Sequence, residues 1–276
     1  MIRLLLLIPL LFCARSSLAQ VNTEQYRSEQ DGGVATTVDV DFGLKKGNVD
    51  LLTGGVDVGT TWQGDQSGFL WVVDGSFAAK RTLADYLDAP DTTLLDEDAQ
   101  YINKILSHLR YNLNLTSHIV LEVFGQIEKN DFLLMDRRLL GGIGPRFTLL
   151  NNDHGNLALG VAYMLEHERL NETAIDVDQQ QRDTRAHRGT SYLSGGVTLG
   201  DTSSFGGTIY VQPRLTEPTD FRLLGEVQLT VGITDLMALG IEFTFRHDSD
   251  PPIVAEDTPA LVATDMAFGQ SLRFSF

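Results

Sequence analysis

The 276-residue chain carries 37 Asp and Glu against 21 Lys and Arg, which gives a formal net charge of −16 at pH 7. This balance argues against a nucleic-acid-binding protein, because phosphate backbones recruit basic surfaces. The chain has one cysteine, Cys13, so the sequence excludes a framework of intramolecular disulfides.

The first 19 residues have the parts of a secretory signal peptide. Arg3 precedes an apolar run at 4–12, and small residues lead to Ala19. The run is too short to span a bilayer as a helix, which takes roughly 20 residues. We therefore expect cleavage after Ala19, which removes Cys13 from the mature chain. Acylation of Cys13, as in a lipoprotein, is the less favoured alternative because the bulky Phe12 precedes it.

Residues 20–33 are polar and show no periodicity, so we expect a flexible periplasmic lead-in to a domain at 34–276. Alternation of apolar and polar residues dominates that domain. Its first copy has Val38 and Val40 on one face of a strand and Asp39 on the other. The same period of two predicts about twelve β-strands, at 38–45, 56–62, 69–77, 105–115, 121–127, 143–149, 157–165, 193–199, 205–215, 221–229, 239–245 and 266–276.

The lengths of the connections indicate how these strands close. Links after the even-numbered strands are short and turn-like, as are the links at 46–48 and 217–220. The long polar links follow strands three, five, seven and eleven, at 81–98, 128–136, 171–188 and 248–261. This parity is typical of an even-stranded barrel with both termini in the periplasm. We predict an all-β, transmembrane, antiparallel up-and-down β-barrel; a secreted soluble β-sandwich or barrel is the alternative.

The last predicted strand favours insertion into an outer membrane. Phe268, Leu272, Phe274 and Phe276 share one face of the strand, and Phe276 ends the printed sequence. A terminal aromatic residue preceded by apolar residues at alternate positions resembles the C-terminal signal of outer-membrane barrels, which implies the barrel-assembly machinery as a partner. Such a residue also suits the aromatic girdle at the membrane interface.

Three segments carry a more specific resemblance: Gly47-Asn48, the glycine-rich stretch 139–147 and the stretch 245–252. In this order they resemble the family of salt-induced outer membrane proteins, an outer-membrane β-barrel domain of unknown function. The resemblance covers roughly 34–276 and implies an outer-membrane barrel linked to salt or osmotic stress, with no catalytic residues to transfer. One departure is Pro145, which stands where we expect an aromatic residue and which interrupts the hydrogen bonding expected of that strand.

If the apolar face meets lipid, the polar face lines the lumen. The residues expected there include Asp57, Lys104, Arg110, Glu122, Arg146, Glu166, Arg214, Arg222, Glu226, Glu242, Arg246 and Arg273. In one interpretation these charges pair across strands and only stabilise the interior. Arg110 then pairs with Glu122. Glu226 and Glu242 pair with the arginines of the last strands, Arg214, Arg222, Arg246 and Arg273. In the other, they line a narrow water-filled path between an acidic wall and an Arg-rich wall.

The sequence offers little for catalysis or metal binding. Ser107 and His108 are adjacent on one strand and therefore point to opposite faces, so they cannot form a nucleophile and base pair. His247, Asp248 and Asp250 could approach a divalent cation but lack the ligand count of a calcium loop. We expect no cofactor, no metal and no enzymatic activity. A barrel-embedded hydrolase acting on outer-membrane lipid or peptide is the alternative.

The sequence thus predicts a Gram-negative outer-membrane barrel that stabilises the envelope or passes small polar solutes or ions. Its expected partners are outer-membrane lipid and lipopolysaccharide, the latter reached through divalent cations that bridge to the acidic outer loops. No nucleic-acid partner is expected, and the pattern does not define an oligomeric state.

Overall fold

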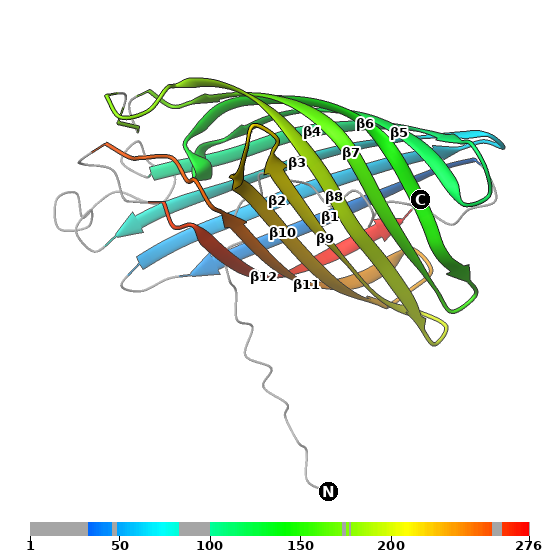
Figure 1. Cartoon of the computed structure of the whole chain (residues 1–276). Coiled ribbons are helices and arrows are strands. Elements are labelled where there is room, and N and C mark those ends of the chain that lie inside the picture. Colours follow the sequence, from blue (N-terminus) through cyan, green and yellow to red (C-terminus); the bar gives the residue numbers. More distant parts are fainter. Residues whose placement is uncertain are drawn as a thin grey trace, which may run out of the picture.

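The computed structural model describes residues 33–45, 49–82, 100–172, 175–176, 178–255 and 261–275. Within them, twelve antiparallel strands close into one barrel, with each strand hydrogen-bonded to its neighbours in the sequence (Figure 1). The strands are β1 (Gly33–Lys45), β2 (Val49–Gln63), β3 (Ser67–Thr82), β4 (Gln100–Asn114), β5 (Ile119–Asn130), β6 (Met135–Asn152), β7 (Gly155–Leu170), β8 (Asp183–Leu199), β9 (Ser203–Arg214), β10 (Glu217–Gly232), β11 (Met237–Asp248) and β12 (Thr264–Ser275). The predicted twelve-stranded up-and-down barrel is confirmed.

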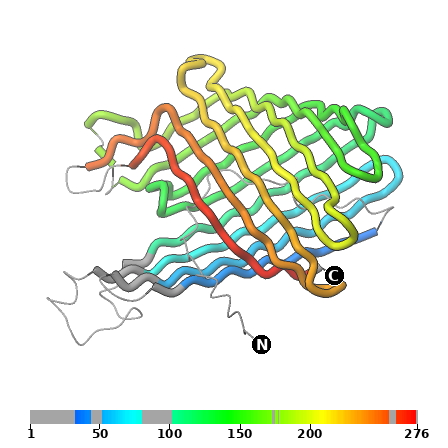
Figure 2. The backbone as a smooth tube through the Cα atoms, turned by 90° about the horizontal axis from the view of Figure 1, so that it is seen from below, coloured from blue at the N-terminus to red at the C-terminus, as the bar shows by residue number. Residues whose placement is uncertain are grey.

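The first and last strands close the barrel. Thr37 to Val40 of β1 pair with Ser275 to Leu272 of β12 in antiparallel register, and the end of β12 meets β1 in Figure 2. The predicted signal peptide, most of the predicted lead-in, and Phe276 lie outside the described residues. No helix in the described part of the chain is long and apolar enough to cross a membrane.

The connections sort to the two ends of the barrel. One end, here called the turn end, carries the links 64–66, 115–118, 153–154, 200–202 and 233–236, together with the start of β1 and the end of β12. The other, here called the loop end, carries the links 131–134, 171–182, 215–216 and 249–263. Two expected links are corrected. The long link at 128–136 shrinks to four residues that contain the 3-10 turn η2 (Asp131–Leu133), and 217–220 belongs to β10.

Alternation along each strand turns polar residues inward and apolar residues outward. In β7, Val161 and Leu165 are 47% and 51% exposed, whereas Met164, Glu166 and Glu168 between and beside them are buried. This is the inverse of a soluble protein, in which buried charge is rare. An apolar outer band around a polar interior is the pattern of a barrel that meets lipid.

Pro145 has a local effect on pairing in β6. On the β5 side the register runs through Pro145, which lies opposite Leu121. On the β7 side pairing breaks between Ile143↔Tyr163 and Arg146↔Gly160 and then resumes. Proline has no N–H to donate to a ladder, so the interruption expected from the sequence falls on one side of the strand.

Candidate functional site in the barrel lumen

The candidate site is the polar interior, and each residue expected to line the lumen lies on its inner side. Lys104, Arg110, Glu122, Glu166, Glu226 and Glu242 are buried. Asp57, Arg146, Arg214, Arg222, Arg246 and Arg273 are half-buried. Their role in lining a conducting path stays a prediction.

The loop-end half of the interior contains a cluster of ion pairs around Arg222 of β10. Its guanidinium donates to both carboxylate oxygens of Glu166, at 3.0 and 2.9 Å, and to Glu168 at 3.3 Å and Asp248 at 3.0 Å. Glu166 and Glu168 belong to β7, so Arg222 reaches past two intervening strands. Arg246 lies 3.7 Å from the same Asp248.

Two further guanidiniums complete this cluster. Arg138 of β6 donates to Glu168 at 2.8 Å through Nε and lies 3.7 Å from Glu128. Arg188 of β8 donates to Glu166 at 3.2 Å and, through both terminal nitrogens, to Asp220 at 3.0 and 3.3 Å. Bidentate pairing fixes guanidinium geometry, so these bonds tie β6, β7, β8, β10 and β11 together from the inside.

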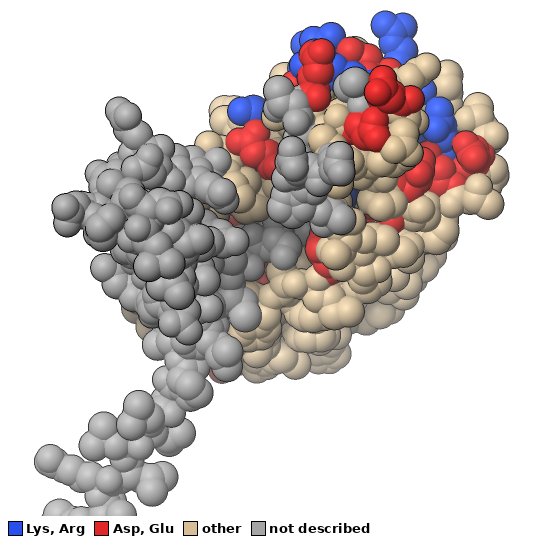
Figure 3. All heavy atoms as spheres, turned by 90° about the vertical axis from the view of Figure 1, so that its left-hand side faces the viewer, with Lys and Arg blue, Asp and Glu red and all other residues tan. Residues whose placement is uncertain are grey.

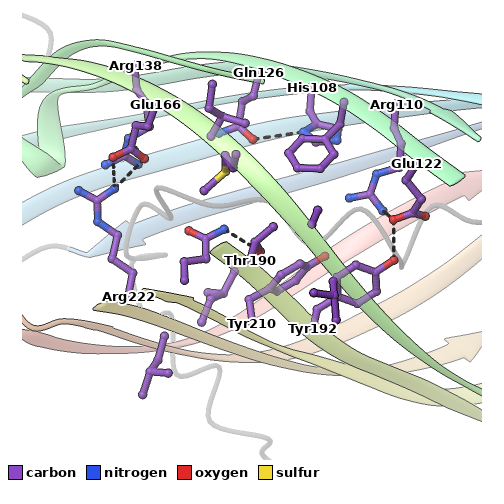
Figure 4. A pocket seen from close by; sticks show the side chains of 18 of the residues that line it. His108, Arg110, Glu122, Gln126, Arg138, Glu166, Thr190, Tyr192, Tyr210 and Arg222 are labelled. Atoms are coloured by element: carbon purple, nitrogen blue, oxygen red, sulfur yellow. Dashed lines mark hydrogen bonds and ion pairs between the residues drawn. The ribbon is translucent and has the colours of Figure 1, made fainter. Parts of the chain in front are cut away.

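Aromatic and charged side chains line a small cavity in the middle of the barrel, where Tyr192 and Tyr210 lie across from Arg110 (Figure 4). Tyr192 of β8 donates its hydroxyl hydrogen to Glu122 of β5 at 2.7 Å, and Arg110 donates to the same Glu122 oxygen at 3.5 Å. The predicted Arg110–Glu122 pair is therefore present. The Arg110 guanidinium also lies 5.8 Å from the ring centre of Phe124 and 5.9 Å from that of Tyr192, within cation–π range. The cavity at this level holds only about 50 Å3.

Larger cavities lie towards both ends. The loop-end cavity, about 170 Å3, is bounded by the ion-pair cluster and by Gln180, Pro251 and Pro252 of the long links. The turn-end cavity, about 270 Å3, is lined largely by glycine, serine and threonine residues, with Arg273 on its wall. Inward-facing Gly196 and Gly206 are opposite each other in register, and their missing side chains widen this end. The interior thus holds a polar cavity towards each end and a small cavity beside Tyr192 between them.

A row of carboxylates crosses the first three strands. Asp39, Asp57 and Asp74 are opposed in register, an arrangement that is unfavourable without counter-charges. Arg273 binds Asp39 with two bonds of 2.8 Å, and Lys104 binds Asp74 at 2.5 Å, so cations flank the row on both sides. The acidic wall expected from the sequence therefore forms ion pairs at its two ends, with Arg273 of β12 and Lys104 of β4.

The long links meet one another over the loop end. Ile175 forms an isolated antiparallel bridge with Val254, and the Gln180 side chain bonds both the carbonyl and the N–H of Ile253, at 2.6 and 3.2 Å. Ile175 is buried by these contacts. Asp250 lies near this bridge, and partial burial together with nearby Asp220, Asp248 and Glu217 raises the pKa of its carboxyl above the usual range.

Several expected pairings are wrong. Arg214, Arg222 and Arg246 were expected to bind Glu226 and Glu242. Instead, Arg214 binds Asp220, and Arg222 binds Asp248 and the glutamates of β7. Arg246 lies near Asp248 and Asp265. The sequence reasoning also missed five inner residues, namely Arg138, Arg188, Tyr192, Asp220 and Asp248. Each keeps the alternation of its strand, so extending the predicted strands towards the loop end would have found them.

The structure assembles no catalytic triad in the described residues. His108 is buried and contacts Gln126 at 3.2 Å, whereas Ser107 faces outward and accepts a bond from Trp71. Ser117 and His118 lie 2.8 Å apart in an exposed turn, where His118 has no carboxylate partner among the described residues. The same part of the chain contains no group of His, Cys, Asp and Glu suited to a metal ion.

A closed antiparallel barrel with an apolar exterior and a charged, narrow interior is the architecture of porin-like outer-membrane barrels. Residues 74–275 match the family described as "Protein of unknown function, DUF481", and the chain belongs to that family. This agrees with the expected outer-membrane barrel domain of unknown function; the link to salt remains a prediction. No curated protein sequence matches the chain.

Three solved structures of outer-membrane channels or porins are similar to this chain, and one of them shares its fold. An outer-membrane channel from Pseudomonas putida F1 superposes with a TM-score of 0.52 and 10% identity, over 93% of this chain and 100% of that one. The NanC porin gives a TM-score of 0.45 and 9% identity over 88% and 98% of the two chains. The KdgM porin gives 0.44 and 8% over 88% and 99%.

Proposed function

We propose that this protein is a narrow, non-enzymatic channel of the outer membrane that passes small polar solutes or ions, with its loop end facing outward. The observation that carries the proposal is the pair of polar cavities towards the two ends of the barrel, with the small central cavity beside Tyr192 between them. Barrels of about eight strands are filled by their own side chains, and those of 16–18 leave open pores. A twelve-stranded barrel lies between these limits, so side chains at the constriction control passage.

Conductance in planar bilayers tests this proposal. We expect the purified protein to give small discrete conductance steps, and Tyr192→Ala to enlarge them by widening the central cavity. Tyr163→Ala is the matched control, because Tyr163 is 43% exposed on the outer face of the wall. Its conductance should equal that of the unaltered protein.

Silence of both the unaltered protein and Tyr192→Ala, across a range of salt and voltage, would refute a channel and leave an envelope-stabilising role. Turnover of outer-membrane lipid or peptide that a serine-directed or metal-chelating inhibitor abolishes would instead support the hydrolase alternative. The proposed link to salt or osmotic stress predicts slower growth of a strain without the protein at high osmolarity only.

A further inference from the structure

A second group of charges lies on the outside of the barrel, at the loop end of β5 to β8. Lys129, Arg137, Arg169 and Arg185 alternate with the buried residues Glu128, Arg138, Glu168 and Ala186, so the four side chains face outward. We call these four residues the rim patch. His167 and His187 face outward beside it. Figure 3, which looks onto the loop end, shows Lys and Arg side chains gathered along part of the rim, with Asp and Glu among them.

The rim patch borders the apolar outer band. Leu139 and Leu165 are the next outward residues below Arg137 and His167 on the same strands, and they are 37% and 51% exposed. Leu139 pairs in register with His167, and Leu165 pairs with His187. The side chains of the rim patch therefore lie at the boundary between lipid tails and headgroups. In the proposed orientation this is the outer leaflet of the membrane.

The rim patch holds more positive charge than its neighbours neutralise. Arg169 binds Asp183 with two bonds of 3.0 Å, and Lys129 lies 3.3 Å from Asp131. Arg137 and Arg185 make no ion pair or hydrogen bond through their side chains to any described residue. Arg137 is also opposite Arg169 in register, a placement that repels unless an anion joins the two.

The positive charge of the rim patch does not continue onto the outer face of β9–β12. At the corresponding level of β9 to β12, the outward residues are Pro213, Leu215, Phe221, Phe245, His247 and Met266, none of them Lys or Arg. A general requirement for cations at the membrane interface would place them around the whole circumference. The absence of Lys and Arg from these outward positions of β9–β12 instead indicates a local site for a ligand.

We infer that the rim patch binds the phosphate groups of an anionic glycolipid of the lipopolysaccharide type, with Arg137 and Arg185 as its principal ligands. Opposed residues on neighbouring strands lie about 5 Å apart and diagonal ones about 7–8 Å, so Arg137, Arg169 and Arg185 are within reach of one phosphorylated headgroup. Guanidinium groups bind phosphate through two parallel hydrogen bonds. Leu139 and Leu165 then contact the acyl chains of the same lipid. The inference rests on the proposed outer-membrane location and replaces the expected contact through cation-bridged acidic loops.

Native mass spectrometry of the detergent-solubilised protein tests the inference with two probes, diphosphorylated lipid A and its dephosphorylated form. We expect the unaltered protein to retain the diphosphorylated lipid preferentially. Each of Arg137→Gln and Arg185→Gln should weaken its binding about tenfold, equivalent to about 1.4 kcal/mol, since each removes hydrogen bonds from a guanidinium to a charged phosphate. Arg182→Gln is the matched control: Arg182 lies at the same end but binds Asp136 and Glu172.

Equal binding of the two lipids, or equal weakening by Arg182→Gln and Arg137→Gln, would overturn the inference. Binding that EDTA abolishes and the arginine substitutions leave unchanged would also overturn it, in favour of cations held by carboxylates. The same preparations are checked for the folded barrel by heat-dependent gel mobility. Cell fractionation tests the outer-membrane location separately, so failure of the proposed function is distinguishable from failure of this site.

Discussion

Arg222→Gln is the sharpest test of the interior, because it removes the cation that Glu166, Glu168 and Asp248 share. Removing one partner of a buried ion pair costs about 3–5 kcal/mol, because the charge left behind stays desolvated. Here each carboxylate keeps a second guanidinium; Glu166, for example, keeps Arg188 at 3.2 Å. We therefore expect the free energy of unfolding to fall by about 3 kcal/mol, at the lower end of that range.

Urea unfolding in lipid vesicles measures this loss through tryptophan fluorescence. Both tryptophans, Trp62 and Trp71, are on the outer face and 44% and 47% exposed, so they report transfer out of the bilayer. Arg169→Gln is the matched control, since Arg169 also has a doubly bonded carboxylate partner but is exposed. A loss below about 1 kcal/mol for Arg222→Gln, as for a surface pair, would show that water screens the cluster and would refute the account of a tightly paired loop end.

Three further outcomes are expected. Gly144→Ala should lower stability by about 3 kcal/mol, because its new methyl group would overlap the backbone of β7; unchanged urea midpoints would contradict that packing. Ile175→Cys with Val254→Cys should form a disulfide visible as a faster band on a non-reducing gel, since cross-strand partners have suitable spacing, whereas absence of the band would contradict the bridge. Deletion of Phe276 should leave the chain in the periplasm, and normal outer-membrane levels would refute its role as an insertion signal.

Strand number and strand face were predictable because apolar and polar residues alternate through the middle of every strand, but strand ends were not. The predicted strand at 193–199 begins ten residues inside the observed β8 (Asp183–Leu199), and that missing stretch contains Arg188. Near the loop end the outward residues are also charged, as Arg185 illustrates. Alternation between apolar and polar residues therefore fades where the wall leaves the apolar band, although the backbone continues as a strand.

Ion-pair partners were predictable only where they lie on adjacent strands. Arg110 and Glu122 belong to neighbouring β4 and β5, and their pairing follows from the hairpin register. Arg222 instead reaches from β10 to Glu166 of β7, and Tyr192 reaches from β8 to Glu122 of β5. Contacts of this kind depend on the tilt and stagger of the whole barrel, which local sequence patterns do not encode.

Charges on the two faces of the same strands therefore have different explanations. Inside, Arg138 and Glu168 pair closely because unpaired charge is costly where little water reaches it. Outside, near the headgroup region, an unpaired charge costs less free energy. The need for a partner therefore does not explain the presence of Arg137, which follows Asp136 and precedes Arg138 on the chain and has no partner among the described residues. Stabilisation by ion pairs explains the inner charges but does not explain Arg137 and Arg185 on the outer face. Binding of an anionic ligand accounts for their sign and for their presence on β5–β8 but not on β9–β12.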